Sequence, residues 1–148
     1  MIPTHTANNK YSYKQIYYKK SLDKWINEIH KYNSKHNHWF YRPLKKGSYG
    51  YDTMAYCIAY TLEHFSYDYT LEELAEIIHE SWSEIYCYWR DYKPYLNNNY
   101  IKPAKPLNDY NRNLLAETSY NKKPIEEKEK DLIIAEYIFN SFHSLYFI

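Results

Sequence analysis

His79 and Trp82 are the residues of this chain whose types and spacing best suit a recognition site. They lie three positions apart in LAEIIHESWSEIYCYW, a stretch whose aliphatic residues recur at helical spacing. Side chains at i and i+3 project from the same side of a helix, so both could line one depression. An indole offers a flat surface to a planar ring, and an imidazole offers a donor or acceptor at the ring edge. The same pair would also suit a buried helix face with a hydrogen-bonded histidine.

The other chemical motifs in the sequence are weak. HNH at residues 36–38 matches the label of a nuclease family in three letters only, without further metal ligands in a ββα setting. With only Gly47 and Gly50 available, a glycine-rich phosphate loop and a G-x-S-x-G elbow are excluded. A hydrolase built on Glu80 or His79 ranks last, because no nucleophile or metal set accompanies them. We therefore expect a protein without enzymatic activity and without a cofactor or metal.

Five glutamates follow helical spacing in the same region: Glu72, Glu73, Glu76, Glu80 and Glu84. Carboxylates spaced in this way repel one another mildly and usually mark a solvated helix face rather than an acid–base pair.

The charge balance excludes a whole-molecule attraction to polyanions. Nineteen Lys and Arg against 18 Asp and Glu leave a net charge of +1, so no overall field favours nucleic acid or an anionic membrane. Arg42, Lys45 and Lys46 beside Trp39 could form a small basic patch that stacks on bases. A few cations on a neutral protein more often mark a solvated loop, so we do not expect a nucleic-acid partner.

Composition and cysteine usage indicate an intracellular protein. The chain holds 21 Tyr but 2 Gly, a bias toward residues with A/T-rich codons that is typical of some viruses, phages and low-GC bacteria. Cys57 and Cys87 each lie in an apolar helical run and are expected to be small core residues rather than a disulfide. No stretch resembles a signal peptide or reaches the roughly 20 apolar residues of a membrane span. We expect a cytoplasmic location, in an infected host cell if the source is viral.

Length and periodicity predict one mainly α-helical domain. A chain of 148 residues forms one core, preceded by a polar and flexible arm over residues 1–15. Helices are expected over four ranges: 21–33, 52–65, 70–90 and from about 124 toward the C-terminus. Glycine and proline assign residues 36–51 and 91–113 to long irregular loops, with a short extended piece near residues 39–41. The expected architecture is two helical hairpins.

Three residues mark the expected helix starts. Asp52 is a plausible N-cap for the second helix. Thr70 opens a T-L-E-E capping box for the third helix, and Pro124 suits the first turn of the last helix.

Two blocks of sequence resemble the ryanodine-receptor (RyR) repeat domain. LEELAEIIHESW is similar to the first helix of that repeat, which closes on I-H-x-x-W, and residues 119–142 resemble its second half. The residues of the second block that fall in register are Tyr120, Pro124, Glu126, Glu127, Lys128 and Asp131. The blocks come in the family's order and cover about residues 70–142. The family's Gly-Trp-x-Tyr-Gly stretch is replaced by RDYKPYLNNNY and its His-Pro by NLLAE, so the far wall of the pocket would differ.

The resemblance implies a helical recognition module over residues 16–148 with no chemistry of its own. Residues 66–146 match the repeat most clearly, and residues 16–65 would be a degenerate repeat or a cap. By position, Trp82 would stack on a nucleotide-like ring and His79 would flank it. Asn33 matches the position of Trp82 in the first half, so Trp39, Trp25 or the Trp82 of a second copy in a homodimer would supply the opposite wall.

The sequence thus leads to two functional hypotheses. The first is a module that binds a small nucleotide or nucleotide-derived ligand, sensing or sequestering a signalling nucleotide in a viral or phage context. Its candidate ligand-binding residues are Trp82, His79, Trp89, Tyr86, Trp39 and Tyr120. The second is a module that binds a host protein through an aromatic surface, since Tyr and Trp suit an interface as well as a pocket.

Overall fold

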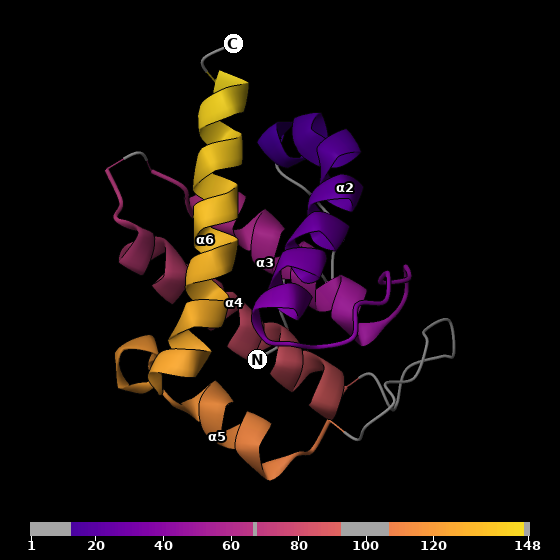
Figure 1. Ribbon diagram of the computed structural model, residues 1–148, viewed down its shortest axis with the longest axis vertical. Coiled ribbons are helices and arrows are strands. Elements are labelled where there is room, and N and C mark those ends of the chain that lie inside the picture. The colour runs from indigo at the N-terminus through magenta and orange to yellow at the C-terminus, as the bar shows by residue number, and fades with distance from the viewer. Residues whose placement is uncertain (1–12, 67, 93–106, 147–148) are drawn as a thin grey trace.

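The structure is a computed structural model that describes residues 13–66, 68–92 and 107–146. Every regular element in these ranges is a helix (Figure 1), so the predicted mainly α class is confirmed. In chain order the elements are α2 (Tyr13–His36), α3 (Tyr49–His64), α4 (Leu71–Asp91), α5 (Tyr110–Glu117), the 3-10 helix η2 (Tyr120–Lys122) and α6 (Ile125–Tyr146). No helix of the described ranges is long and apolar enough to cross a membrane.

The helix starts confirm two of the three sequence signals. At α4, Glu73 N–H donates to Thr70 Oγ1 and Thr70 N–H donates to Glu73 Oε1, both at 3.1 Å, which is the predicted capping box. Helix α6 begins directly after Pro124. Asp52 is not the N-cap of α3, because Ser48 takes that role by accepting from Tyr51 N–H at 3.2 Å.

Gly50 explains why α3 starts earlier than the sequence suggested. Glycine is usually a loop signal, but here it lies within the first turn of α3. A Cβ at this position would stand 2.9 Å from Leu44 Cδ2, so the missing side chain lets the preceding loop pack closely on the helix.

The sequence missed helix α5 in the stretch predicted to be a loop. Asp109 caps it by accepting from Arg112 N–H at 3.0 Å. None of its residues is buried, so it lacks the apolar stripe from which a helix is read. Residues 93–106 of the predicted loop lie outside the described residues.

Two other segments differ from expectation. Helix α2 already begins at Tyr13, inside the predicted arm, while residues 1–12 lie outside the described residues. The extended piece expected near residues 39–41 is not a strand, because the described residues there form an irregular loop.

Helix α4 is the centre of the packing. It contacts α3, α5, η2 and α6, and α2 packs against α3 and α6. In Figure 1, α2 and α6 run beside each other along the long axis. Helix α5 lies across the end of the molecule that is opposite the C-terminus. Since α4 packs against α3 as well as α6, the helices form one bundle, and the predicted arrangement of two hairpins is not confirmed.

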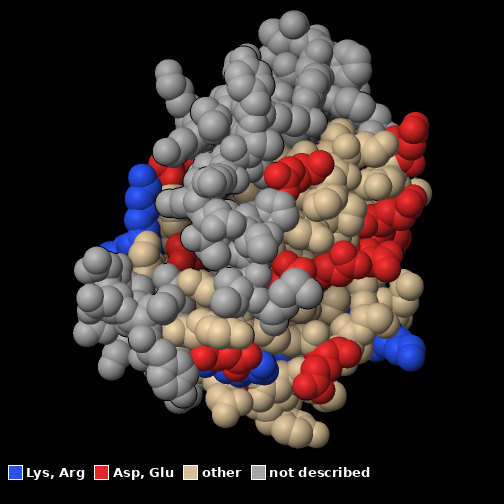
Figure 2. All heavy atoms as spheres, turned by 180° about the vertical axis from the view of Figure 1, so that it is seen from behind, with Lys and Arg blue, Asp and Glu red and all other residues tan. Residues whose placement is uncertain are grey.

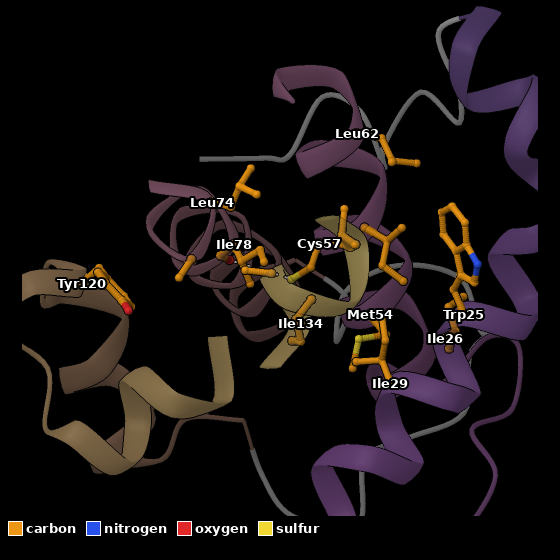
Figure 3. Packing of buried hydrophobic residues seen from close by; sticks show 14 residues of the cluster. Trp25, Ile26, Ile29, Met54, Cys57, Leu62, Leu74, Ile78, Tyr120 and Ile134 are labelled. Atoms are coloured by element: carbon orange, nitrogen blue, oxygen red, sulfur yellow. Dashed lines mark hydrogen bonds between the residues drawn. The ribbon is translucent and has the colours of Figure 1, made fainter. Parts of the chain in front are cut away.

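The buried side chains form two clusters that meet at Trp82. The larger one is mainly aliphatic and joins α2, α3, α4 and α6; Figure 3 labels among its members Trp25, Ile26, Ile29, Met54, Cys57, Leu62, Leu74, Ile78, Tyr120 and Ile134. The smaller one is mainly aromatic: Tyr56, Ile85, Tyr86, Tyr88, Trp89 and Leu107. Trp82 is half-buried and packs against both. Cys57 is buried and Cys87 half-buried, and both are free thiols as predicted.

Candidate functional site

A pocket with a volume of about 510 Å³ opens between residues of α2 to α6 and the loop that follows α2. Its size falls within the range of small-molecule sites. We call it the indole pocket, after the two tryptophans in its wall. The lining residues considered below are Asn33, Trp39, Tyr49, Thr53, Trp82, Arg112, Glu127, Lys123, Lys130 and Asp131.

Trp82 lies in a stack of rings along α4. His79 is one turn before it, with ring centroids 6.1 Å apart and planes 20° apart. Tyr86 is one turn after it, at 5.3 Å and 15°. His79 precedes Trp82 by about one turn and Tyr86 follows it by about one turn, so the two rings flank the indole along the helix. Trp82 is half-buried between these rings and contributes to the wall of the pocket.

Trp39 is the more exposed of the two indoles in the pocket wall. It is 50% exposed and lies just beyond α2. His38 turns the chain there with φ of 59°, and Trp39 N–H donates to Ser34 O at 2.7 Å. The Lys130 ammonium lies 5.2 Å from the Trp39 ring centroid, a cation–π contact that a planar guest could replace.

Two polar side chains of the lining have unsatisfied atoms. Asn33 is 6% exposed, and its Oδ1 is buried without a hydrogen-bond partner in the described part of the chain. Thr53 Oγ1 is likewise buried without a hydrogen-bond partner in the described part of the chain. A buried polar atom without a partner costs about 1–3 kcal/mol, and both atoms lie within the wall rather than at its surface.

Arg112 differs from the other cations of the pocket. Lys123 Nζ lies 2.6 Å from Asp131 Oδ2, and Lys130 Nζ lies 3.0 Å from Glu127 Oε1. Among the described residues, Arg112 has no carboxylate within ion-pair distance. Its guanidinium lies 5.9 Å from the centroid of the Tyr49 ring. Burial raises the pKa of Tyr49 to about 12 against the opposing effect of the Arg112 charge, so Tyr49 is neutral and leaves Arg112 able to bind an anion.

His79 is a buried residue that forms hydrogen bonds behind the wall of the indole pocket. It is 4% exposed, and its Nε2–H donates to Thr118 O at 2.5 Å while Nδ1 accepts from Lys123 Nζ at 3.1 Å. This arrangement requires the neutral ring, and burial together with the Lys123 charge lowers the pKa of His79. Lys123 in turn binds Asp131, whose pKa burial raises to about 6 despite the Lys123 charge. The chain of contacts ties α4 to α6.

A second pocket of about 410 Å³ lies on the other side of His79. We call it the acidic pocket, because its lining includes Glu76, Glu80, Glu84 and Glu117. Burial and the two neighbouring carboxylates on α4 raise the pKa of Glu80. Among the charged side chains on the described part of the face in Figure 2, acidic ones cover more of the surface than basic ones. No three His, Cys, Asp or Glu side chains in the described ranges are arranged to hold a metal ion.

The structure separates the six candidate residues into three pairs. Trp82 and Trp39 line the indole pocket together. His79 and Tyr120 line the acidic pocket instead, where the Tyr120 hydroxyl donates to Glu72 Oε2 at 2.7 Å.

Tyr86 and Trp89 are core residues. They are 0% and 1% exposed within the aromatic cluster and line neither pocket. Sequence reasoning had selected them because they share the helix of Trp82. It missed Asn33 and Thr53, because a single polar residue on an amphipathic helix gives no sequence signal. It missed Arg112, because helix α5 was predicted to be a loop.

No protein-family model matches the chain, and no curated protein or solved structure gives a significant match.

Proposed function

We propose that this protein is a non-enzymatic module that binds a small nucleotide or nucleotide-derived ligand in the indole pocket. One observation carries the proposal: a single pocket combines an exposed indole, a cation that has no carboxylate partner among the described residues, and the polar side chains of Asn33 and Thr53. A nucleotide has three matching parts, namely a planar base, hydrogen-bonding groups on the base edge and an anionic phosphate.

The aromatic part of the site is divided between two tryptophans with different roles. Trp39 provides the stacking face, which is worth about 1–3 kcal/mol for one base. Trp82 limits the space on the opposite side, since its own neighbours hold it in place. This differs from the expectation that Trp82 itself would stack on the ligand.

Arg112 provides the anion contact. A guanidinium binds phosphate oxygens through two parallel N–H groups, and a hydrogen bond to a charged group contributes about 1.5–3 kcal/mol. Together with one stacked base this falls short of the roughly 8 kcal/mol of a 1 μM complex. The unsatisfied polar atoms and the apolar walls must supply the rest, so we expect micromolar affinity at best.

The resemblance to the RyR repeat supports the same proposal. Both blocks contribute to the pocket: Trp82 comes from the first, and Glu127 and Asp131 come from the second. Of the residues in register in the second block, Asp131 pairs with Lys123, and the Lys128 ammonium lies 5.4 Å from the centroid of the Tyr120 ring. We propose a RyR-like module whose pocket uses Trp39 as its second aromatic residue.

Calorimetric titration of the full chain with mono-, di- and cyclic nucleotides tests this function. At least one nucleotide should bind in a 1:1 ratio, and Trp39→Ala should weaken it about 5- to 150-fold through the lost stacking. Phe40→Ala is the matched control, because Phe40 is adjacent, 83% exposed and not part of the pocket. Heats indistinguishable from dilution across the whole panel would refute the proposal.

A protein partner is the second candidate function, favoured by the exposed aromatic surface beside the pocket. Tyr32 and Phe40 are 58% and 83% exposed, and the Arg42 guanidinium lies 5.4 Å from the Phe40 ring centroid. Aromatic residues and Arg are enriched in protein interfaces. In affinity capture from host lysate, this function predicts a stoichiometric partner that Phe40→Ala loses and Trp39→Ala retains. The opposite pattern would favour the indole pocket.

A further inference from the structure

We infer that the nucleotide of the indole pocket belongs to a single-stranded nucleic acid, whose neighbouring nucleotides lie on a basic strip beside the pocket. This inference rests on the proposed function, because it names the kind of molecule that carries the bound nucleotide. The basic strip consists of exposed cationic and aromatic side chains on α2 and the loop that follows it: Lys31, Lys35, Trp39, Phe40, Arg42 and Lys45.

The loop after α2 turns back and follows that helix, so side chains from both segments share one surface. Trp39 N–H donates to Ser34 O at 2.7 Å, and Leu44 N–H donates to Asn27 Oδ1 at 2.8 Å. As the loop advances from Trp39 to Leu44, its contacts in α2 therefore move backward from Ser34 to Asn27. Between these two contacts α2 rises about 10 Å, at about 1.5 Å per residue.

The net charge of +1, from which no nucleic-acid partner is expected, conceals a local excess of positive charge. The 23 residues from Ile29 to Tyr51 contain five Lys and Arg residues and no Asp or Glu. Lys46 pairs with Asp23 at 3.4 Å. The other four have no carboxylate within ion-pair distance in the described part of the chain: Lys31, Lys35, Arg42 and Lys45. These four cations are left to bind phosphates, and their attraction is local rather than a property of the whole molecule.

Aromatic rings lie beside these cations. The Arg42 guanidinium is 5.4 Å from the centroid of the Phe40 ring, and the Lys31 ammonium is 5.8 Å from that of the half-buried Tyr41 ring. Phe40 is 83% exposed and Trp39 is 50% exposed, so both rings are accessible to a planar group. Surfaces that bind single strands combine cations that follow the phosphates with aromatic rings on which successive bases stack.

Trp39 connects the basic strip with the indole pocket. It lines the pocket, and Phe40 follows it directly in the chain. A base stacked on Trp39 thus has a second exposed ring nearby for the next base of the same strand. An acidic peptide would match only the charge of the strip, whereas a single strand matches both the charge and the rings. The bases of a duplex are paired and stacked on each other, so they are not free to use these rings.

The test compares AMP with an oligoadenylate of about six nucleotides, a length within the usual range of such sites. In calorimetric titration of the full chain, the oligoadenylate should bind about 5- to 150-fold more tightly through an additional stacked base. Phe40→Ala should remove this gain and leave AMP unchanged, since Phe40 does not line the pocket. Tyr110→Ala is the matched control, because Tyr110 is 79% exposed on α5 and lies outside the strip and the pocket lining.

The salt dependence of oligoadenylate binding tests the phosphate contacts separately. Arg42→Gln should reduce the slope of log K against log salt by about 0.7, the contribution of one phosphate contact with a single strand. Lys122→Gln changes the net charge equally and is the control, because Lys122 is exposed on η2, outside the strip. An equal change of slope in both variants would show that the strip does not contact the phosphates.

The outcomes separate this inference from the proposed function. If AMP binds but the oligoadenylate binds no more tightly, or if Phe40→Ala keeps the gain, the inference is wrong while nucleotide binding stands. A glutamate peptide of similar charge that binds as tightly as the oligoadenylate would overturn the inference in favour of an acidic protein partner. If neither AMP nor the oligoadenylate binds, the inference fails, and the proposed function fails too if no other nucleotide binds.

Discussion

The indole pocket and the acidic pocket differ in what their walls leave unsatisfied. They are similar in size, about 510 and 410 Å³, and the Lys123–His79 hydrogen bond connects the wall of one to the wall of the other. The wall of the indole pocket contains charged pairs, aromatic rings and two buried polar atoms that have no hydrogen-bond partner in the part of the chain that the structure describes. In the acidic pocket, four glutamates repel one another.

The comparison shows that volume alone does not identify a site. Carboxylates that repel one another are easily satisfied by water and counter-ions at a surface. A buried carboxamide oxygen has no such alternative, because bulk water does not reach it. The unsatisfied group, and not the larger concentration of charge, is therefore the better guide to ligand chemistry.

The largest expected effect is a loss of stability when Lys123, which connects the walls of the two pockets, is replaced. Lys123→Met removes the cation from a buried pair and leaves Asp131 and His79 Nδ1 without their donor. Loss of one partner of a buried pair costs about 3–5 kcal/mol of unfolding free energy. Urea denaturation followed by circular dichroism measures it.

The control for this prediction is Lys24→Met. The Lys24 side chain is 73% exposed, and its contact with Glu28 should contribute under about 1 kcal/mol. The double variant Lys123→Met with Asp131→Leu should recover much of the loss, because it removes the uncompensated carboxyl as well. A loss below about 1 kcal/mol for Lys123→Met would mean that the two pockets do not share a structural wall.

An intermediate effect should follow from changing Arg112. Arg112→Gln removes the proposed phosphate-binding guanidinium, so AMP should bind about 10- to 150-fold more weakly while adenosine, which has no phosphate, should be unaffected. Glu80→Gln in the acidic pocket is the control and should change AMP affinity by less than about twofold at physiological salt. Calorimetric titration measures both ligands. An effect of Glu80→Gln equal to that of Arg112→Gln would place the ligand in the acidic pocket.

The smallest expected effect is a dependence of stability on pH that arises from His79. Its pKa is lowered in the folded protein by burial and by Lys123, so below about pH 6.5 the unfolded chain binds this proton more readily. The contribution of His79 to folding stability should therefore fall as the pH decreases from 7 toward 5. Asp131, with its pKa raised to about 6, acts in the opposite direction.

A variant separates the contribution of His79 from that of Asp131. His79→Gln keeps one acceptor and one donor for Lys123 and Thr118 but does not titrate. Denaturation of both proteins at pH 7 and pH 5 should show that the wild type loses more stability than His79→Gln. Equal losses would show that the proton on His79 is not linked to folding.

Sequence patterns predicted local features well where one helix turn decides them. The capping box of Thr70 and the start of α6 after Pro124 involve residues within a few positions of each other. The N-cap of α3 was misplaced because Ser48 and Asp52 are both good caps, and the packing of Leu44 against Gly50 favours the earlier one. Helix α5 was missed because it buries no residue.

The candidate site was predicted in part. The sequence selected Trp82 and Trp39, which do share a pocket, but it could not show that His79 and Tyr86 cover the faces of Trp82. It also could not distinguish Trp39 from Trp25, which is 6% exposed in the core. Which side of an aromatic ring is open depends on neighbours from other helices.

The sequence by itself determined the helical class, because apolar spacing and capping residues act within one helix. It also determined that no charge surplus attracts a polyanion, since net charge is a sum over residues. Only the tertiary structure decided that Lys123 joins His79 to Asp131 and that Asn33, Thr53 and Arg112 share a pocket with two indoles. These residues are far apart in the chain, and they meet because α4 packs against α3, α5 and α6 while α2, which carries Asn33, packs against α3 and α6.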